Sequence, residues 1–263
     1  MTPSGPPARS AFPTYDALVR SVSRWLPLLV LAMGGSAAAA CGAADDAPDE
    51  PAPAAPARRV PMARTCTLPA GHSGKPETIE QAVALLNALP KPVTVACFLQ
   101  VLDRPFHIDV SSGNFSLQPA FGPANPRIFV FSGQLVVSVV PKGQGAGVME
   151  LGVLREAGRT LKAEIPFPIT ADIPKAAPYE RILHGEDGTS CGVCHENESR
   201  DWSIDFAKGY ASRVIPPARE NQIEPAYLEW VYQQCDPAQE PDRCAVLDAV
   251  FGPNDVVYQR LTR

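Results

Sequence analysis

Seven cysteines constrain this 263-residue chain more than any other feature of its sequence. The count is odd, so disulfide pairing alone cannot use every thiol. Two of the cysteines stand in the run Cys191-Gly192-Val193-Cys194-His195, and Cys41 follows four alanines. The other four are predicted to form two disulfides, Cys66 with Cys97 and Cys235 with Cys244. This scheme assigns a use to all seven, and it suits an oxidising compartment.

The C-x-x-C-H run predicts one covalently bound haem c. Two thiols one helical turn apart can add to the two vinyl groups of haem, and the adjacent histidine then ligates the iron. Cys191 and Cys194 are therefore the expected attachment residues, and His195 is the expected proximal ligand. Three other uses stay open: a redox-active thiol pair, a structural disulfide, and a zinc site completed by Cys235.

The sixth position of the iron has no obvious ligand, because no Met or His follows His195 in the sequence. His184 is the first candidate, since a glycine follows it and its loop could fold over the ring. Met149, in an expected strand, is the weaker candidate. Water or five-coordinate iron is the remaining alternative. Three further residues are expected to be structural or too close to the N-terminal tether, namely His107, Met62 and His72.

An export signal is predicted at the N-terminus. Residues 25–33 form an apolar core that follows Arg24 and precedes small residues, and this core is too short to span a membrane. The run Ala38-Ala39-Ala40-Cys41 resembles the lipobox of bacterial lipoproteins, although that class usually has a large aliphatic residue where Ala38 stands. The resemblance implies cleavage before Cys41, acylation of Cys41 and, because Gly42 follows, an outer-membrane location. An ordinary signal peptide is the alternative.

Composition divides the chain into four segments. Residues 1–40 are the expected lipoprotein signal peptide, and residues 41–64 are an expected disordered tether rich in Ala, Pro and acidic residues. Residues 65–170 are predicted to form a β-rich sandwich or open barrel with one N-terminal helix. Residues 171–263 are predicted to form a small helical haem-binding module. The predicted fold class is α+β, and a single core shared by both segments stays open.

Helices and strands are predicted from capping and periodicity. Thr78-Ile79-Glu80-Gln81 indicates a capping box that starts a helix, which Pro90 ends. Strands are predicted at residues 93–99, 106–110, 127–131, 135–140, 148–154 and 160–167. Helices are predicted at residues 204–214, 225–234 and 242–251.

The C-x-x-C-H run resembles that of c-type cytochromes, and the predicted export supports this resemblance because c-type haem is attached outside the cytoplasm. The stretch from Cys66 to Arg263 is also similar to uncharacterised cytochrome c domain-containing lipoproteins of Gram-negative bacteria. That similarity rests on three runs, Gln118-Pro119-Ala120, Pro126-Arg127-Ile128-Phe129 and Gln234-Cys235-Asp236. It implies an exported haem protein and no established activity.

Charge narrows the possible partners. The net charge is −5, and residues 1–40 hold three Arg against one Asp, so their removal leaves −5 − 2, or about −7. Such a chain is not suited to nucleic acid, and it could dock a basic protein. We expect a one-electron carrier that is anchored by lipid to a membrane, faces the periplasm and serves a redox protein of unknown identity. The alternatives are an open-site haem enzyme or sensor, and a β-sandwich binding or scaffold protein with ancillary haem.

Overall fold

The computed structural model describes residues 59–113 and 116–262, which lie within one compact unit, Ala55–Arg263. The predicted signal peptide, Cys41 and most of the predicted tether lie outside the described residues. None of the helices in the described ranges is long and apolar enough to cross a membrane.

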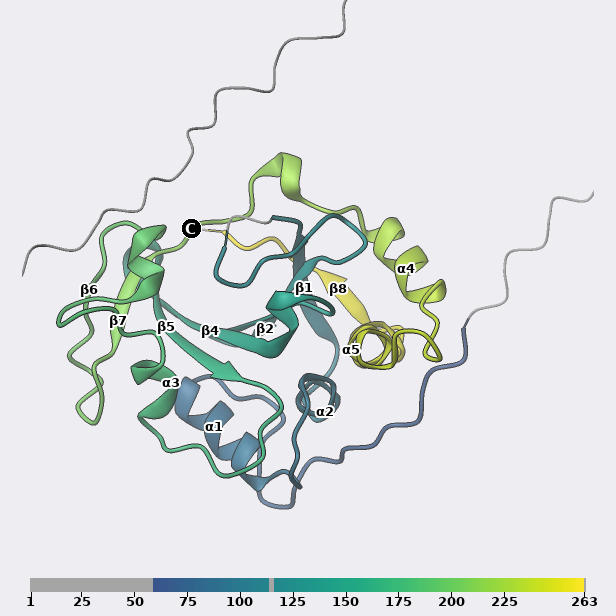
Figure 1. The fold of residues 1–263 in the computed structure, drawn as a ribbon, viewed down its shortest axis with the longest axis horizontal. Helices are drawn as coiled ribbons and strands as arrows, with labels where there is room; N and C mark the ends of the chain where they lie inside the picture. The colour runs from purple at the N-terminus through teal and green to yellow at the C-terminus, as the bar shows by residue number, and fades with distance from the viewer. Residues whose placement is uncertain (1–58, 114–115, 263) are drawn as a thin grey trace, which may run out of the picture. The chain divides into compact units, whose positions relative to one another are not determined.

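One open eight-stranded sheet organises this unit (Figure 1). The strand order is β6-β7-β5-β4-β3-β2-β1-β8, and every neighbouring pair is antiparallel except β1 with β8. The strands are β1 (Phe106–Ser111), β2 (Arg127–Ser132), β3 (Leu135–Val139), β4 (Val148–Arg155), β5 (Arg159–Pro166), β6 (Ser199–Arg200), β7 (Tyr210–Arg213) and β8 (Val256–Tyr258).

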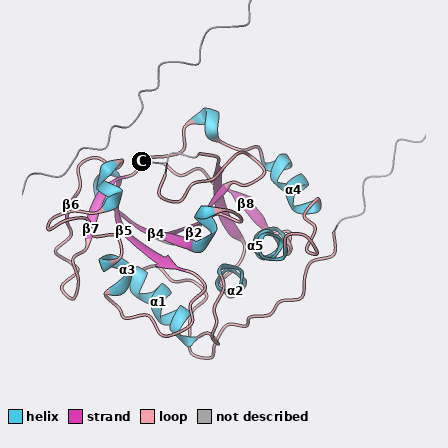
Figure 2. Cartoon of the chain, in the orientation of Figure 1, coloured by secondary structure: helices cyan, strands magenta, loops and turns pink. Residues whose placement is uncertain are grey.

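Five α-helices accompany the sheet, and α1, α2 and α5 run along one side of it (Figure 2). They are α1 (Ile79–Ala88), α2 (Val95–Gln100), α3 (Ala177–Glu180), α4 (Pro225–Gln233) and α5 (Pro241–Phe251). α2 packs against α5, and α1 contacts β4. The helices predicted at residues 225–234 and 242–251 are thereby confirmed as α4 and α5.

The main core lies between this helical layer and one face of the sheet. Alternate strand residues point into it, for example Ile108 in β1, Val137 in β3 and Met149 in β4, all fully buried. This alternation follows from the period of two of a β-strand. The other strand residues face the opposite side, where loops cover the sheet.

The predicted start of α1 is confirmed. The Thr78 hydroxyl accepts a hydrogen bond from the Gln81 amide at 3.2 Å, as an N-cap residue does. The Gln81 side chain reaches one residue further back than expected, because its Oε1 accepts from the amide of Glu77 at 2.7 Å. The apolar face of α1 is buried as predicted.

The strand predicted at residues 93–99 is wrong. Val93 makes a single bridge with Ile169, and the chain then turns into α2. The Thr94 hydroxyl caps this helix by accepting from the Cys97 amide at 3.1 Å, and every residue of α2 is buried. A helix that is buried on all sides has a continuous apolar run, which cannot be distinguished from a buried strand by its pattern. Tertiary packing here outweighs the β-propensity of the valines.

The helix predicted at residues 204–214 is also wrong. Tyr210–Arg213 form β7, which pairs with β5 so that Ala211 lies opposite Leu161. The segment lacks a helical period, and the free edge of β5 supplies hydrogen-bond partners that a short isolated helix would not have.

The sheet crosses the expected boundary at residue 170. β6, β7 and β8 come from the segment expected to be helical, and β8 pairs with β1 while β7 pairs with β5. The α+β class is confirmed. The strands lie in one open sheet, however, and not in the two packed sheets of a sandwich.

Candidate haem-attachment site

A cavity of about 230 Å³ lies on the loop-covered face of the sheet. Strand residues Arg127, Glu150, Thr160 and Lys162 contribute to its floor. Loop residues cover the cavity from the other side, namely Ile182, Ser190, Cys191, Cys194, His195, Val214 and Ile215. The volume is several times the roughly 30 Å³ that one water occupies in the liquid, so the cavity has room for more than a single water.

The C-x-x-C-H run is wound as one helical turn at the edge of this cavity. A short 3₁₀ helix spans Ser190–Val193, and the amides of Cys194 and His195 both donate to the carbonyl of Cys191, at 3.2 and 2.9 Å. Residues three and four apart on a helical turn lie on the same side. The turn therefore places Cys191, Cys194 and His195 together, and all three line the cavity.

Glu198 holds this turn in place. Its carboxylate accepts from the Thr189 amide at 2.7 Å and from the Thr189 hydroxyl. A Cβ added to Gly192 would lie 2.7 Å from Glu198 Oε1, closer than real Cβ contacts come. The glycine inside the motif thus permits the close approach of the carboxylate that anchors the loop.

His195 is oriented by a backbone carbonyl. Its Nδ1 lies 2.8 Å from the carbonyl oxygen of Arg213, at the end of β7, and so carries the hydrogen and donates it. Burial and, after it, the positive charge of Lys162 lower the pKa of His195 to about 4. The imidazole is therefore neutral near pH 7, with the Nε2 lone pair available to a metal.

The two motif thiols are free and differ in environment. Cys191 is partly buried and Cys194 is exposed. Burial and the nearby Glu150 carboxylate raise the pKa of Cys191 to about 11. A group bonded to both sulfurs would have to extend from the cavity to its rim.

These findings weaken the other uses of the motif. The thiols do not form a disulfide with each other. A redox-active pair needs a thiol with a lowered pKa, whereas that of Cys191 is raised. The zinc alternative required Cys235, which is bonded to Cys244. Among the described residues, no three His, Cys, Asp or Glu side chains converge on a possible metal position.

Both predicted disulfides are confirmed. Cys66 and Cys97 have Cα atoms 5.3 Å apart, and Cys235 and Cys244 have Cα atoms 5.6 Å apart. The first ties the segment before α1 to α2, and the second joins α4 to α5.

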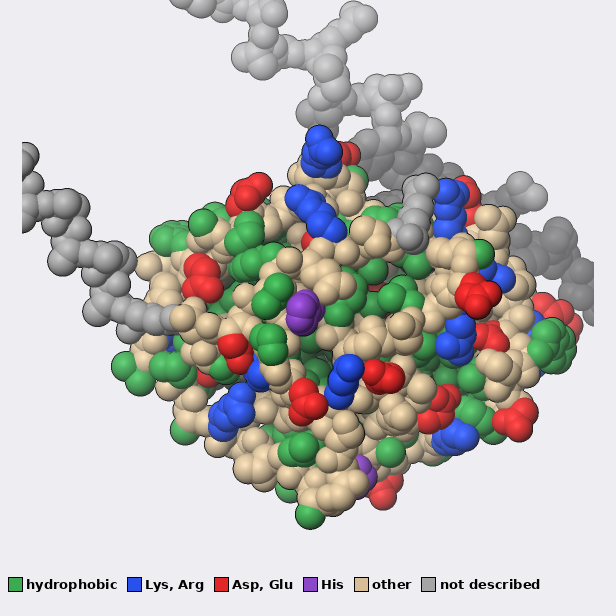
Figure 3. All heavy atoms as spheres, turned by 180° about the vertical axis from the view of Figure 1, so that it is seen from behind, with side chains coloured by type: hydrophobic (Ala, Val, Ile, Leu, Met, Phe, Trp, Pro, Cys, Tyr) green, Lys and Arg blue, Asp and Glu red, His purple; other side chains and the backbone are tan. Residues whose placement is uncertain are grey.

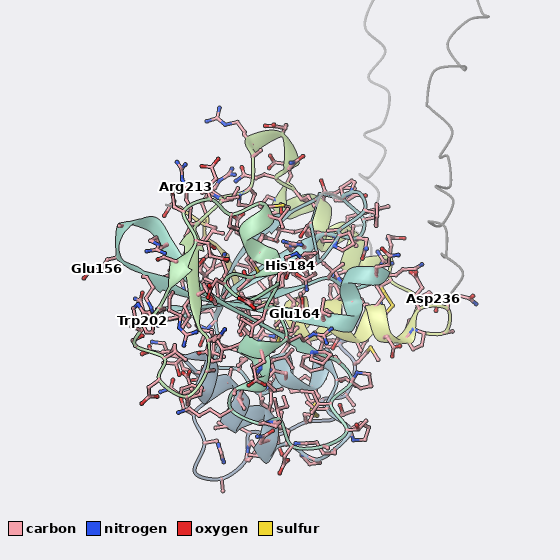
Figure 4. The ribbon with its side chains drawn as sticks, turned by 60° about the vertical axis from the view of Figure 1, so that its left-hand side comes forward. Glu156, Glu164, His184, Trp202, Arg213 and Asp236 are labelled. Carbon is pink, nitrogen blue, oxygen red and sulfur yellow. A yellow bond between two sulfur atoms is a disulfide. The ribbon has the colours of Figure 1, made fainter. Side chains whose placement is uncertain are left out.

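The expected distal ligands do not line the cavity. Met149 is fully buried on the core face of β4, on the other side of the sheet from Glu150 and Gly152. His184 is exposed on the loop after α3, apart from Arg213 at the end of β7 (Figure 4). The three residues that were not favoured as ligands also lie elsewhere, namely Met62, His72 and His107.

Sequence reasoning missed several residues of the site, namely Glu150, Thr160, Lys162, Glu198 and the carbonyl of Arg213. Polar residues that alternate with apolar ones in a strand usually indicate a solvent-facing side. Here that side is covered by loops distant in the sequence, so the strand pattern alone held no signal for a cavity.

Charged side chains of both signs line the cavity, namely Arg127, Glu150, Lys162 and Glu164. In the face seen in Figure 3, acidic and basic residues are interspersed among apolar ones, and neither sign forms a continuous patch. Inside the cavity, Arg127 donates to the Gln118 carbonyl and lies 3.5 Å from Glu150.

Comparison of the chain with protein-family models, with curated proteins and with solved structures finds no match.

Proposed function

We propose that the described unit is a monohaem c-type cytochrome module. Cys191 and Cys194 would carry the two thioether links, and His195 would be the proximal ligand. The observation that carries the proposal is the hydrogen bond from His195 Nδ1 to the Arg213 carbonyl, within a helical turn that bears two free thiols. A hydrogen bond at the other ring nitrogen fixes the ring orientation and tautomer that metal ligation needs.

The residues present suit a haem group in three respects. The donor set has the chemistry of c-type attachment, with two unpaired thiols and a neutral imidazole. Arg127 lines the cavity and matches the acidic groups of a haem. The buried hydroxyl of Thr160, which also lines the cavity, has no hydrogen-bond partner among the described residues. When bound, haem would supply one-electron redox chemistry.

We further propose that the protein is a one-electron carrier, exported and anchored by lipid at Cys41 to the periplasmic face of a membrane. A single haem suits one-electron relay, and the sequence contains no second C-x-x-C-H run of the kind dihaem peroxidases use. The two disulfides support an oxidising compartment. The redox partner is a protein of unknown identity.

A pyridine haemochrome assay and an intact mass test the cofactor. Full-length protein from a host with c-type maturation machinery is expected to hold one haem per chain and to gain the mass of one tetrapyrrole. The variant Cys191→Ala/Cys194→Ala is expected to lose the covalent haem. The matched variant Cys235→Ala/Cys244→Ala also loses two sulfurs and is expected to keep it. Colourless wild-type protein of apoprotein mass would overturn the proposal.

Ligand binding distinguishes a carrier from the alternatives. A low-spin spectrum that does not respond to carbon monoxide or cyanide supports electron transfer. A high-spin spectrum that does respond supports an open-site enzyme or sensor. Full biological activity of Cys191→Ala/Cys194→Ala protein would instead support a binding or scaffold role with ancillary haem.

A further inference from the structure

One lysine rises from the floor of the cavity. Lys162 of β5 pairs with Gly152 of β4, and the two face the same side of the sheet as Glu150. Gly152 has no side chain, and a Cβ there would meet nothing closer than Thr160 at 3.7 Å. The position beside Lys162 is therefore open, and the lysine side chain has space to extend into the cavity.

In the part of the chain that the structure describes, Lys162 makes no hydrogen bond and no ion pair, although the Glu150 and Glu198 carboxylates lie near enough to favour its charge. Other cavity charges are engaged: Arg127 donates to Ser116 and the Gln118 carbonyl, and Glu150 lies 3.5 Å from Arg127. A partly buried ammonium that makes no hydrogen bond is costly. Lys162 thus presents a nitrogen without a hydrogen-bond acceptor to the cavity.

His195 and Lys162 reach the cavity from different layers. His195 belongs to the loop layer, where its ring is tied to the Arg213 carbonyl, and Lys162 belongs to the sheet beneath. A planar group held between the two layers would meet the imidazole on one face and the sheet on the other.

Among the described residues that line the cavity, elimination leaves Lys162 as the nitrogen ligand besides His195. Arg127 cannot ligate a metal, because a guanidinium stays protonated in proteins. Cys191 and Cys194 would be used by the thioether links. Met149 lies on the core side of the sheet, and His184 does not line the cavity.

We propose that Lys162 Nζ would be the second protein ligand of the haem iron, together with His195. The inference rests on the proposed function, since it requires the haem. Ligation would require the ammonium to lose its proton to bulk solvent, so that the nitrogen lone pair could be donated to iron. With both residues bound, the haem would have no open position for a substrate.

The test uses full-length holoprotein and the optical and electron paramagnetic resonance spectra of its ferric form. Wild type is expected to be low-spin with a signature of histidine–amine ligation. Lys162→Ala and Lys162→Arg are both expected to become high-spin at unchanged haem content. The arginine variant keeps the positive charge and loses the ligating lone pair, so it separates ligation from a purely electrostatic role.

Cyanide affinity gives a second readout. If the lysine is off the iron in a tenth of the molecules or fewer, its removal should tighten cyanide binding about tenfold or more. The control Lys208→Ala removes an exposed lysine that donates to the Glu186 carbonyl, and it should leave the spectra unchanged.

Four results would overturn the proposal: a high-spin wild type, a low-spin Lys162→Ala, a low-spin Lys162→Arg, or a loss of the low-spin signal in His184→Ala alone. The wild-type signature decides the question even where a variant fails to fold. Protein without covalent haem in the haemochrome assay would remove the proposed function as well, so the two failures are distinguishable.

Discussion

At the scale of single residues, the C-x-x-C-H run owes its geometry to neighbours outside it. The Arg213 carbonyl sets the tautomer of His195, and Glu198 holds Thr189 at the start of the turn. Burial against Glu150 makes the thiol of Cys191 a poor acid. The contacts of Glu198 and of Cys191 each make a measurable prediction for the apoprotein.

Cys191 should react slowly with an alkylating agent. Its pKa is raised from 9.0 to about 11, so below pH 9 the reactive thiolate is about 100-fold rarer than for an unperturbed thiol. Iodoacetamide labelling of apoprotein at pH 8, followed by peptide mass spectrometry, should modify the exposed Cys194 first. Equal rates at the two sulfurs would contradict the buried placement of Cys191.

Glu198→Ala should destabilise the apoprotein by about 1–3 kcal/mol, because it leaves the buried Thr189 amide without its acceptor. Thr189→Val removes the hydroxyl from the other side of the same contact. Because the two residues share one interaction, urea unfolding of the single and double variants should give effects that are not additive. Strict additivity would show that the two groups do not interact.

At the scale of elements, the disulfides link helices to segments nearby in the fold. Cys235 and Cys244 link α4 and α5 across nine positions of chain, whereas Cys66 and Cys97 are 31 positions apart. In the loop-entropy model, the longer closed loop confers the larger stabilisation.

Replacing both cysteines of the α4–α5 pair with alanine should lower the free energy of unfolding by about 2–3 kcal/mol. Replacing Cys66 and Cys97 with alanine should lower it by about 1 kcal/mol more than that. Urea denaturation of the two double variants measures the order. A larger loss for the α4–α5 pair would indicate that cavities left by the buried Cys235 and Cys244 outweigh chain entropy.

At the scale of the whole molecule, we propose that the N-terminal segment anchors the protein to a membrane and that the folded unit holds the haem. If Cys41 is acylated, Cys41→Ser should abolish labelling by a fatty-acid analogue and move the protein from the membrane to the soluble fraction. The Cys66→Ser/Cys97→Ser variant is the control for loss of thiols and should stay membrane-bound. Membrane retention of Cys41→Ser would contradict the lipid anchor.

Much of the fold could be predicted from local patterns. The cap at Thr78, the five strands from Phe106 to Pro166, and helices α4 and α5 follow from short-range rules of hydrogen bonding and periodicity. Prediction failed at α2 and β7, where continuous burial and the free edge of β5 outweighed local preference.

The sequence by itself determined the C-x-x-C-H run, the two disulfide pairings and the class of fold, because these depend on spacing and residue type along short stretches. Only the tertiary structure decided that residues 171–263 share the sheet of the preceding segment, that Met149 faces the core and that Lys162 faces the cavity. The alternation of residues along a strand shows that the strand has two faces, but it does not show what covers each face. Which face becomes enclosed depends on loops that are distant in the sequence.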